Sequence, residues 1–304
     1  CQRLGHPGRC TCRKMAQTEQ KNQNVKKQFE ELQSLLERAM ALQTSMVLFE
    51  WDDETLAPKG AAEHTARVIG SLSEQYQEIL ASMRFKELLD VCLKAEKENA
   101  GVFDEVQSAI LREAAEEQER LSCIPPEEYR AYAELTACAT GIWTRAREKN
   151  DFASFAPVLK EIISYQKKFA AYRAKPGQKL YDVMLDTYEK GFNMEMLDPF
   201  FELMKGKIVP LLKESAERSK MVPDAFLSAD YPEAAQAEAA RFLAEYEGFD
   251  FDRGVLALSA HPFTTNLHNH DVRITTHYQK RIDSSIFSVL HETGHAIYEF
   301  GIRD

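Results

Sequence analysis

Apolar and polar residues follow a helical period along most of the chain. From about Asn24 to Met46 the apolar residues recur three and four positions apart, with Glu, Lys and Arg between them. This spacing is typical of an amphipathic helix that buries one face. Similar spacing predicts further helices around residues 62 to 97, 101 to 121, 127 to 148, 152 to 173, 194 to 219 and 231 to 246. The pattern therefore predicts a mainly α fold class.

Short segments that contain Pro, Gly or Asp separate the predicted helices. Pro lacks the backbone N–H that an α-helix needs, and Gly weakens a helix, so these segments end one helix before the next begins. They include Ala57-Pro58-Lys59-Gly60, Ile124-Pro125-Pro126, Lys175-Pro176-Gly177 and Val222-Pro223-Asp224. The chain is thus expected to be a succession of long helices with short loops.

One segment departs from the helical period. Residues 271 to 278, with the sequence DVRITTHY, are rich in β-branched residues and alternate in polarity, which is typical of a strand. A final helix follows over SSIFSVLHETGHAIYEFG, residues 284 to 301. Ser284 or Ser285 is a suitable N-cap for it, and Gly301 a suitable left-handed end. We therefore expect a short β ribbon directly before the last helix.

Composition and charge exclude several classes of partner. The net charge of −10 would repel a phosphate backbone, and no segment combines clustered Lys and Arg with aromatic residues, so we expect no nucleic-acid partner. No apolar run approaches the roughly 18 to 20 residues that span a bilayer, and the first residues lack the pattern of a signal peptide. These observations predict a cytoplasmic protein without a membrane partner. The polar, Gly-containing residues 1–23 are expected to be a disordered extension.

The residues that carry chemistry concentrate near the C-terminal end. Six of the eight histidines lie between His261 and His295. His291 and His295 are four positions apart on the predicted helix, so both imidazoles project from one face and can bind one metal ion. Glu292 lies about 100° round from His291, where it can take a proton from a metal-bound water as that water attacks a carbonyl. We predict two metal ligands and a general base, against the alternative of a chance His-Glu-x-x-His pattern.

Two further residues are weaker candidates for substrate binding. His261 precedes Pro262, and a lone His in that position is more often part of a turn. Arg273 in the predicted strand can hold a substrate carboxylate through two hydrogen bonds, or can pair with Asp271. The spacing of His268, His270 and His277 does not tie them to the metal pair, so we expect them at the surface or supporting the ligands.

Taken together, these motifs resemble a known family. HPF at 261–263, DVRIT at 271–275 and HETGH at 291–295 are similar to motifs of the carboxypeptidase Taq family of metallocarboxypeptidases. Upstream segments at 49–67, 146–159 and 181–192 are also similar, so the resemblance covers roughly residues 25–304.

The resemblance implies a long-helix, gluzincin-like peptidase fold with a deep groove, and one divalent ion, zinc or cobalt. It also implies removal of C-terminal residues from peptides with broad specificity, and a homodimer in the full-length form. His291 and His295 would be the metal ligands and Glu292 the general base. His261 and Arg273 would lie in the groove wall as substrate-binding residues.

The resemblance also implies a third metal ligand, a Glu, beyond the end of this sequence at Asp304. Residues 24–304 are therefore expected to be the N-terminal portion of a single helical domain, and the activity of this chain alone stays open. Two alternatives remain. One is a non-catalytic helical protein that binds peptides; the other is an oligopeptidase-type endopeptidase that shares the HExxH helix.

Overall fold

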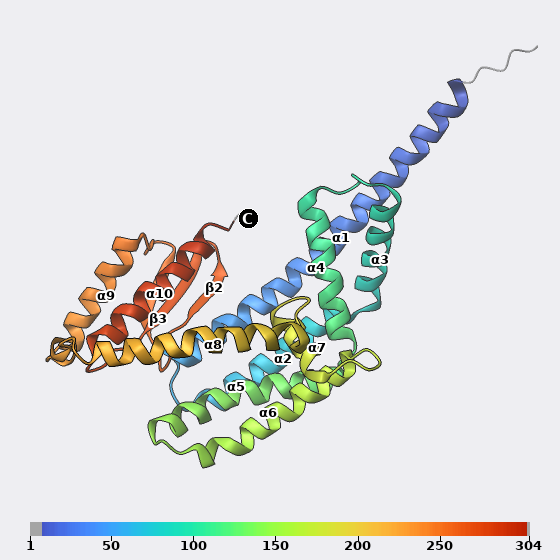
Figure 1. The fold of residues 1–304 in the computed structure, drawn as a ribbon. Coiled ribbons are helices and arrows are strands. Elements are labelled where there is room, and N and C mark those ends of the chain that lie inside the picture. The colour runs from blue at the N-terminus through green and yellow to red at the C-terminus, as the bar shows by residue number, and fades with distance from the viewer. Residues whose placement is uncertain (1–7, 303–304) are drawn as a thin grey trace, which may run out of the picture. The chain divides into compact units, whose positions relative to one another are not determined.

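The computed structural model describes residues 8–302, which are mainly helical, with one small sheet (Figure 1). The helices are α1 Gly8–Thr55, α2 Ala62–Ala81, α3 Met83–Glu98, α4 Glu105–Ser122, α5 Pro126–Glu148, α6 Phe152–Arg173, α7 Leu180–Tyr188, α8 Met194–Ser219, the 3₁₀ helix η1 Ala225–Ser228, α9 Glu233–Glu247 and α10 Ile282–Phe300. The strands are β1 Gly254–Leu258, β2 Thr264–His268 and β3 Asp271–Thr276. The mainly α fold class predicted from the sequence is confirmed.

Most of the predicted helices are present, with three differences. The helix predicted over 62 to 97 is divided at Ser82, whose hydroxyl accepts a hydrogen bond from the backbone N of Phe85 at 3.2 Å and so caps α3. The short helix α7 was not predicted. The third difference is that α1 begins at Gly8, and residues 13 to 22 are mostly good helix formers. The disordered extension predicted for residues 1–23 stays a prediction. Residues 1–7 lie outside the described part of the chain.

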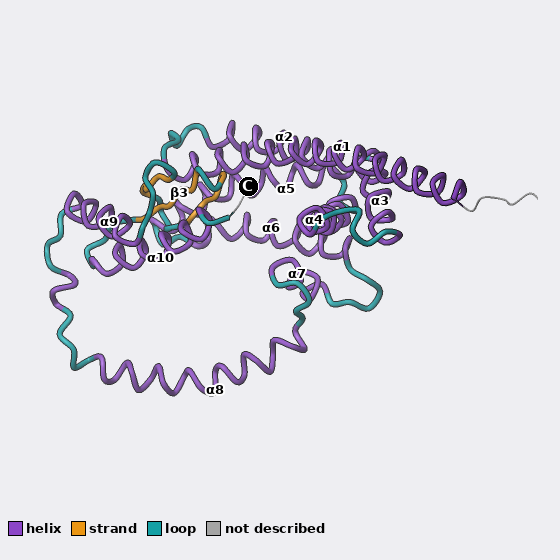
Figure 2. The backbone as a smooth tube through the Cα atoms, turned by 90° about the horizontal axis from the view of Figure 1, so that it is seen from above, coloured by secondary structure: helices purple, strands orange, loops and turns teal. Residues whose placement is uncertain are grey.

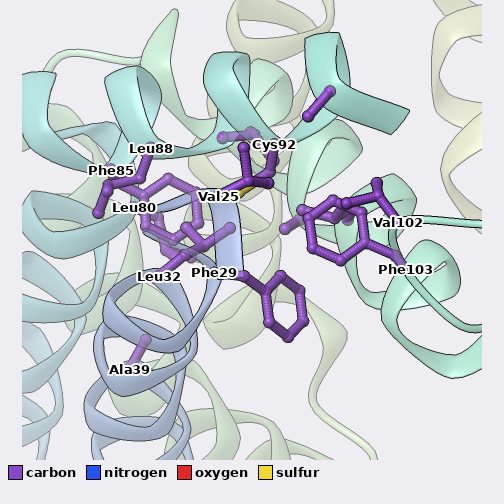
Figure 3. Packing of buried hydrophobic residues seen from close by; sticks show 14 of the residues in the cluster. Val25, Phe29, Leu32, Ala39, Leu80, Phe85, Leu88, Cys92, Val102 and Phe103 are labelled. Carbon is purple, nitrogen blue, oxygen red and sulfur yellow. The ribbon is translucent and has the colours of Figure 1, made fainter. Parts of the chain in front are cut away.

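The chain divides into two compact units. The first contains the chain up to Met46 together with Arg67–Leu135. Its core joins one stripe of α1 to α2, α3 and α4, and Leu32 and Phe85 at its centre are fully buried (Figure 3). The rings of Phe29 and Phe103 meet there with centroids 5.1 Å apart. Because this core uses the apolar stripe that the sequence pattern located, the predicted amphipathic helix over 24 to 46 is confirmed.

The second unit contains Val47–Ala66 and the chain from Thr136 onward. Its sheet has the order β1-β3-β2, with β1 parallel and β2 antiparallel to β3. Figure 2 shows the strands beside α10, and α10 packs against both β3 and α9. The central strand β3 is the predicted one, whereas β1 and β2 were not predicted. The expected ribbon before the last helix is thus a three-stranded sheet.

Helix α10 lies on this sheet through a buried stripe. Val289 and Ala296, seven positions apart, are fully buried in a cluster with Val272 and Ile274 of β3. Spacing of seven returns to the same face of a helix after two turns. His291 and His295 are exposed on the opposite side of α10, away from this stripe.

The N-cap predicted for α10 was wrong, and the predicted C-cap, Gly301, has the right position but not the predicted left-handed conformation. The helix begins at Ile282 after Arg281, and no side chain caps it. Ser285 lies inside the helix, buried, and its hydroxyl is 3.1 Å from Oε1 of Gln236 in α9, so tertiary packing uses the residue that was expected to cap. Gly301 has φ −85° and is right-handed. Among the described helices, none is long and apolar enough to cross a membrane.

Candidate metal and general-base site

His291 and His295 face each other across one turn of α10. Their Nε2 atoms are 3.1 Å apart, their ring centroids are 4.7 Å apart, and both side chains are exposed. Two nitrogens about 2.0–2.1 Å from one tetrahedral ion would be roughly 3.3 Å apart. The pair therefore already has the separation of two ligands that share a metal ion.

Glu292 lies on the neighbouring side of the same turn and is 8 % exposed. Its Oε2 atom accepts a hydrogen bond of 2.6 Å from Oγ1 of Thr264 in β2. A second contact joins β2 to α10 two helical turns after Glu292, where Nδ2 of Asn266 donates a hydrogen bond to Oε2 of Glu299. Thr264 and Asn266 are alternate residues of one strand, so both side chains leave the same face of β2. Sequence reasoning missed both residues.

The HPF and DVRIT motifs are joined by Thr275, which is fully buried. Its Oγ1 accepts a hydrogen bond of 2.9 Å from the backbone N of Phe263, and its own backbone N donates to the carbonyl of Phe263 at 2.9 Å. The hydroxyl of Ser259 also lies 2.7 Å from Oγ1 of Thr275 and 2.7 Å from the carbonyl oxygen of His261. These bonds fix the loop that carries His261 to the central strand.

Arg273 is held within the protein on two sides. Its Nε and Nη2 atoms each donate to Asp271 at 2.8 Å, and its guanidinium lies 4.7 Å above the ring of Trp51. The hydrogen bonds to Asp271 raise the pKa of Arg273 above its ordinary value, so the residue stays charged. The ring of Trp51 is buried and forms a rigid base for the guanidinium. Of the two roles considered for Arg273, the structure shows the pair with Asp271.

The other four histidines between His261 and His295 lie in or directly beside the strands of the sheet. His261 is exposed. Burial and then Asp53 raise the pKa of the Glu54 carboxyl, and His261 lowers it by a smaller amount. The pKa of His277 is lowered, first by burial and then by Arg147 and His261. His268 and His270 stack with ring centroids 5.5 Å apart at the turn between β2 and β3.

The described residues do not supply a third metal ligand. Among them, no His, Cys, Asp or Glu joins His291 and His295 in a group that could hold a metal ion. Glu299 follows His295 by one turn, but its carboxylate is engaged by Asn266. The histidine pair therefore offers two of the three protein ligands that a catalytic zinc ion normally has.

Comparison with known proteins identifies the protein family of this chain. The sequence profile of the carboxypeptidase Taq (M32) metallopeptidases matches residues 31–304. The chain belongs to this family. Carboxypeptidase 1 of Bacillus subtilis is 35 % identical to it, over 89 % of this chain and 53 % of that protein.

Solved structures show the same fold as this M32 chain. The crystal structure of BsuCP matches with a TM-score of 0.86 and 34 % identity, over 91 % of this chain and 55 % of that one. Metallocarboxypeptidase 1 of Trypanosoma cruzi matches with a TM-score of 0.76 and 30 % identity, again over 91 % and 55 %. The chain thus spans about half the length of the relatives it matches.

Proposed function

We propose that this chain provides the two-histidine and general-base part of a metal-dependent carboxypeptidase, which removes C-terminal residues from peptides. The observation that carries the proposal is the turn of α10 at residues 291–295. There, two exposed imidazole nitrogens 3.1 Å apart lie beside a buried carboxylate on the same turn. Membership of the M32 metallopeptidases and the names of the relatives support the same reaction.

The roles of the residues follow from their chemistry. His291 and His295 would hold the metal ion, for which we propose zinc because two imidazoles and an oxygen ligand are a common zinc set. A bound divalent ion polarises the substrate carbonyl and makes its bound water acidic. Glu292 would take the proton of the attacking water and pass it to the leaving amine, since a carboxylate within reach can act as base and then as acid.

Arg273 and His261 are proposed to act in substrate binding, as the sequence resemblance implied. Arg273 keeps one nitrogen, Nη1, beyond the two that bind Asp271. His261 is exposed on a loop that Thr275 and Ser259 hold in place. A fixed loop and a fixed guanidinium are suited to binding because little side-chain freedom is lost when a ligand arrives.

The activity can be tested with two samples. One is this 304-residue chain; the other, the completed protein, is the chain joined to the part of Bacillus subtilis carboxypeptidase 1 that it does not match. We expect the completed protein to release single C-terminal residues in the presence of zinc and to lose this activity after removal of the metal by a chelator. Glu292→Gln should lower its rate by about 10² to 10⁴ while metal binding is retained. A rate unchanged by Glu292→Gln would contradict the assignment.

The C-terminus of the test peptide distinguishes a carboxypeptidase from an endopeptidase and from a peptide-binding protein. A carboxypeptidase leaves a peptide with an amidated C-terminus intact and shortens the same peptide with a free carboxylate, one residue at a time. An endopeptidase cuts both peptides internally, and a binding protein cuts neither. Mass spectrometry of the products therefore separates the three.

A further inference from the structure

Thr264 is the one side chain in the described part of the chain that hydrogen-bonds the carboxylate of Glu292. The distance of 2.6 Å between Oγ1 and Oε2 is that of a short O–H···O hydrogen bond. The same Oγ1 is 3.1 Å from the backbone carbonyl oxygen of Glu292. A hydroxyl has a single proton, so the closer carboxylate oxygen receives it.

We propose that Thr264 is a positioning residue for the general base and keeps the carboxylate of Glu292 beside the histidine pair. The role as base rests on the proposed function, whereas the contact itself does not. At 8 % exposure the carboxylate needs a hydrogen-bond donor, because a buried polar group without a partner is costly. Without the hydroxyl, the carboxylate is expected to turn toward solvent. The hydrogen bond engages Oε2 of Glu292, so Oε1 is the carboxylate oxygen that Thr264 does not bind.

Thr264 is itself held rigidly. It lies opposite Ile274 in the antiparallel pair of β2 and β3, and Ile274 is fully buried. The residue before it, Phe263, is bound at both its backbone N and its carbonyl by Thr275. The DVRIT motif thus fixes the HPF loop, and the HPF loop fixes the residue that holds Glu292. A positioning group works only if it is more rigid than the group it positions.

Carboxyl labelling of the 304-residue chain tests the contact without any metal or activity. The protein is treated with a carbodiimide and an amine, and the labelling rate of Glu292 is read by mass spectrometry of its peptide. We expect slow labelling in the wild type and in Thr264→Ser, which keeps the hydroxyl. Thr264→Val keeps the shape without the donor and should label Glu292 several times faster. Equal rates in all three proteins would overturn the proposal.

Two controls accompany the labelling. Glu299, which Asn266 binds, should label at the same rate in every variant. Thr265→Val places the same valine at the next position of β2, whose side chain points to the other face, and should leave Glu292 unchanged. If Thr264→Val does not fold by circular dichroism, Thr264→Ala against Thr264→Ser makes the same comparison. Faster labelling in Thr265→Val would indicate a general loosening of the strand and would also overturn the proposal.

Kinetics add the functional measurement in any preparation that shows metal-dependent hydrolysis. Thr264→Val should lower kcat by about 10- to 100-fold, the size of effect that a misplaced catalytic group produces, with KM and metal affinity unchanged. Thr264→Ser should restore most of the rate. In a Glu292→Gln background, Thr264→Val should cause no further loss, because it acts through that carboxylate. If no wild-type preparation hydrolyses peptides, the proposed function fails, while the labelling result still decides the role of Thr264.

Discussion

Two glycines near the site have very different surroundings. A Cβ atom on Gly254 of β1 would meet the ring of Phe249 and come within 2.7 Å of the carbonyl oxygen of Val272. A Cβ atom on Gly294 of α10 would meet nothing within 4 Å. We expect Gly254→Ala to lower the free energy of unfolding by about 1–3 kcal/mol through overpacking. Gly294→Ala should raise it by up to about 1 kcal/mol, since Ala is the better helix former.

Denaturant titration of the two variants checks this prediction. The substitutions add the same methyl group and serve as controls for each other. A loss of stability in Gly294→Ala would mean that the open space beside Gly294 of α10 is filled in solution.

The site residues differ in how far the sequence could locate them. His291, Glu292 and His295 lie on one helical turn, so their spacing fixes their geometry before any tertiary contact is known. Thr264 is 28 positions from Glu292, and no local pattern pairs two residues that meet only when a strand packs on a helix. Its place directly after the HPF motif was the one available signal.

At the scale of elements, the hydroxyl of Thr275 is one of several groups that hold the loop between β1 and β2 on the central strand. Thr275 and Thr276 are adjacent in β3 and both fully buried. Oγ1 of Thr275 contacts Phe263 and Ser259, whereas Oγ1 of Thr276 has no hydrogen-bond partner in the described residues. Thr275→Val leaves buried polar groups unpaired and should cost about 1–3 kcal/mol, while Thr276→Val should be nearly neutral or stabilising.

Thermal unfolding of both variants measures the difference, and hydrogen exchange at the backbone amide of Phe263 localises it. Exchange should speed up in Thr275→Val alone. Similar melting temperatures for the two variants would show that the hydroxyl of Thr275 is not what holds the loop.

The elements themselves were predicted unevenly, for physical reasons. Long helices repeat their apolar spacing over several turns, so α4, α5, α6, α8 and α9 were found close to their observed bounds. The nine-residue α7 and the five-residue strands β1 and β2 are too short for a period to stand out. The predicted N-cap of α10 was wrong for another reason. Ser285 is bound to Gln236 of α9, and a local capping rule does not consider such a tertiary partner.

At the scale of the whole molecule, helix α8 departs most strongly from the expectation that an amphipathic helix buries its apolar face. None of its residues is buried, and its exposed apolar side chains include Phe200, Phe201, Leu203, Leu211 and Leu212. The sequence pattern predicted this helix from its amphipathic spacing. Its apolar side chains are therefore present, but no element among the described residues buries them. Burying one large apolar side chain is worth about 1.5–3 kcal/mol, and exposed patches of this kind promote association.

We therefore expect the 304-residue chain to bind a hydrophobic dye and to self-associate as its concentration rises. Leu211→Lys with Leu212→Lys should weaken both effects without lowering the free energy of unfolding, because the two leucines are 64 % and 61 % exposed. Ser215→Lys with Ala216→Lys adds the same charge one turn later in α8 and is the matched control. Sedimentation velocity measures the association, and dye fluorescence measures the exposed surface. Equal weakening by both pairs would attribute the association to charge instead of to the leucines.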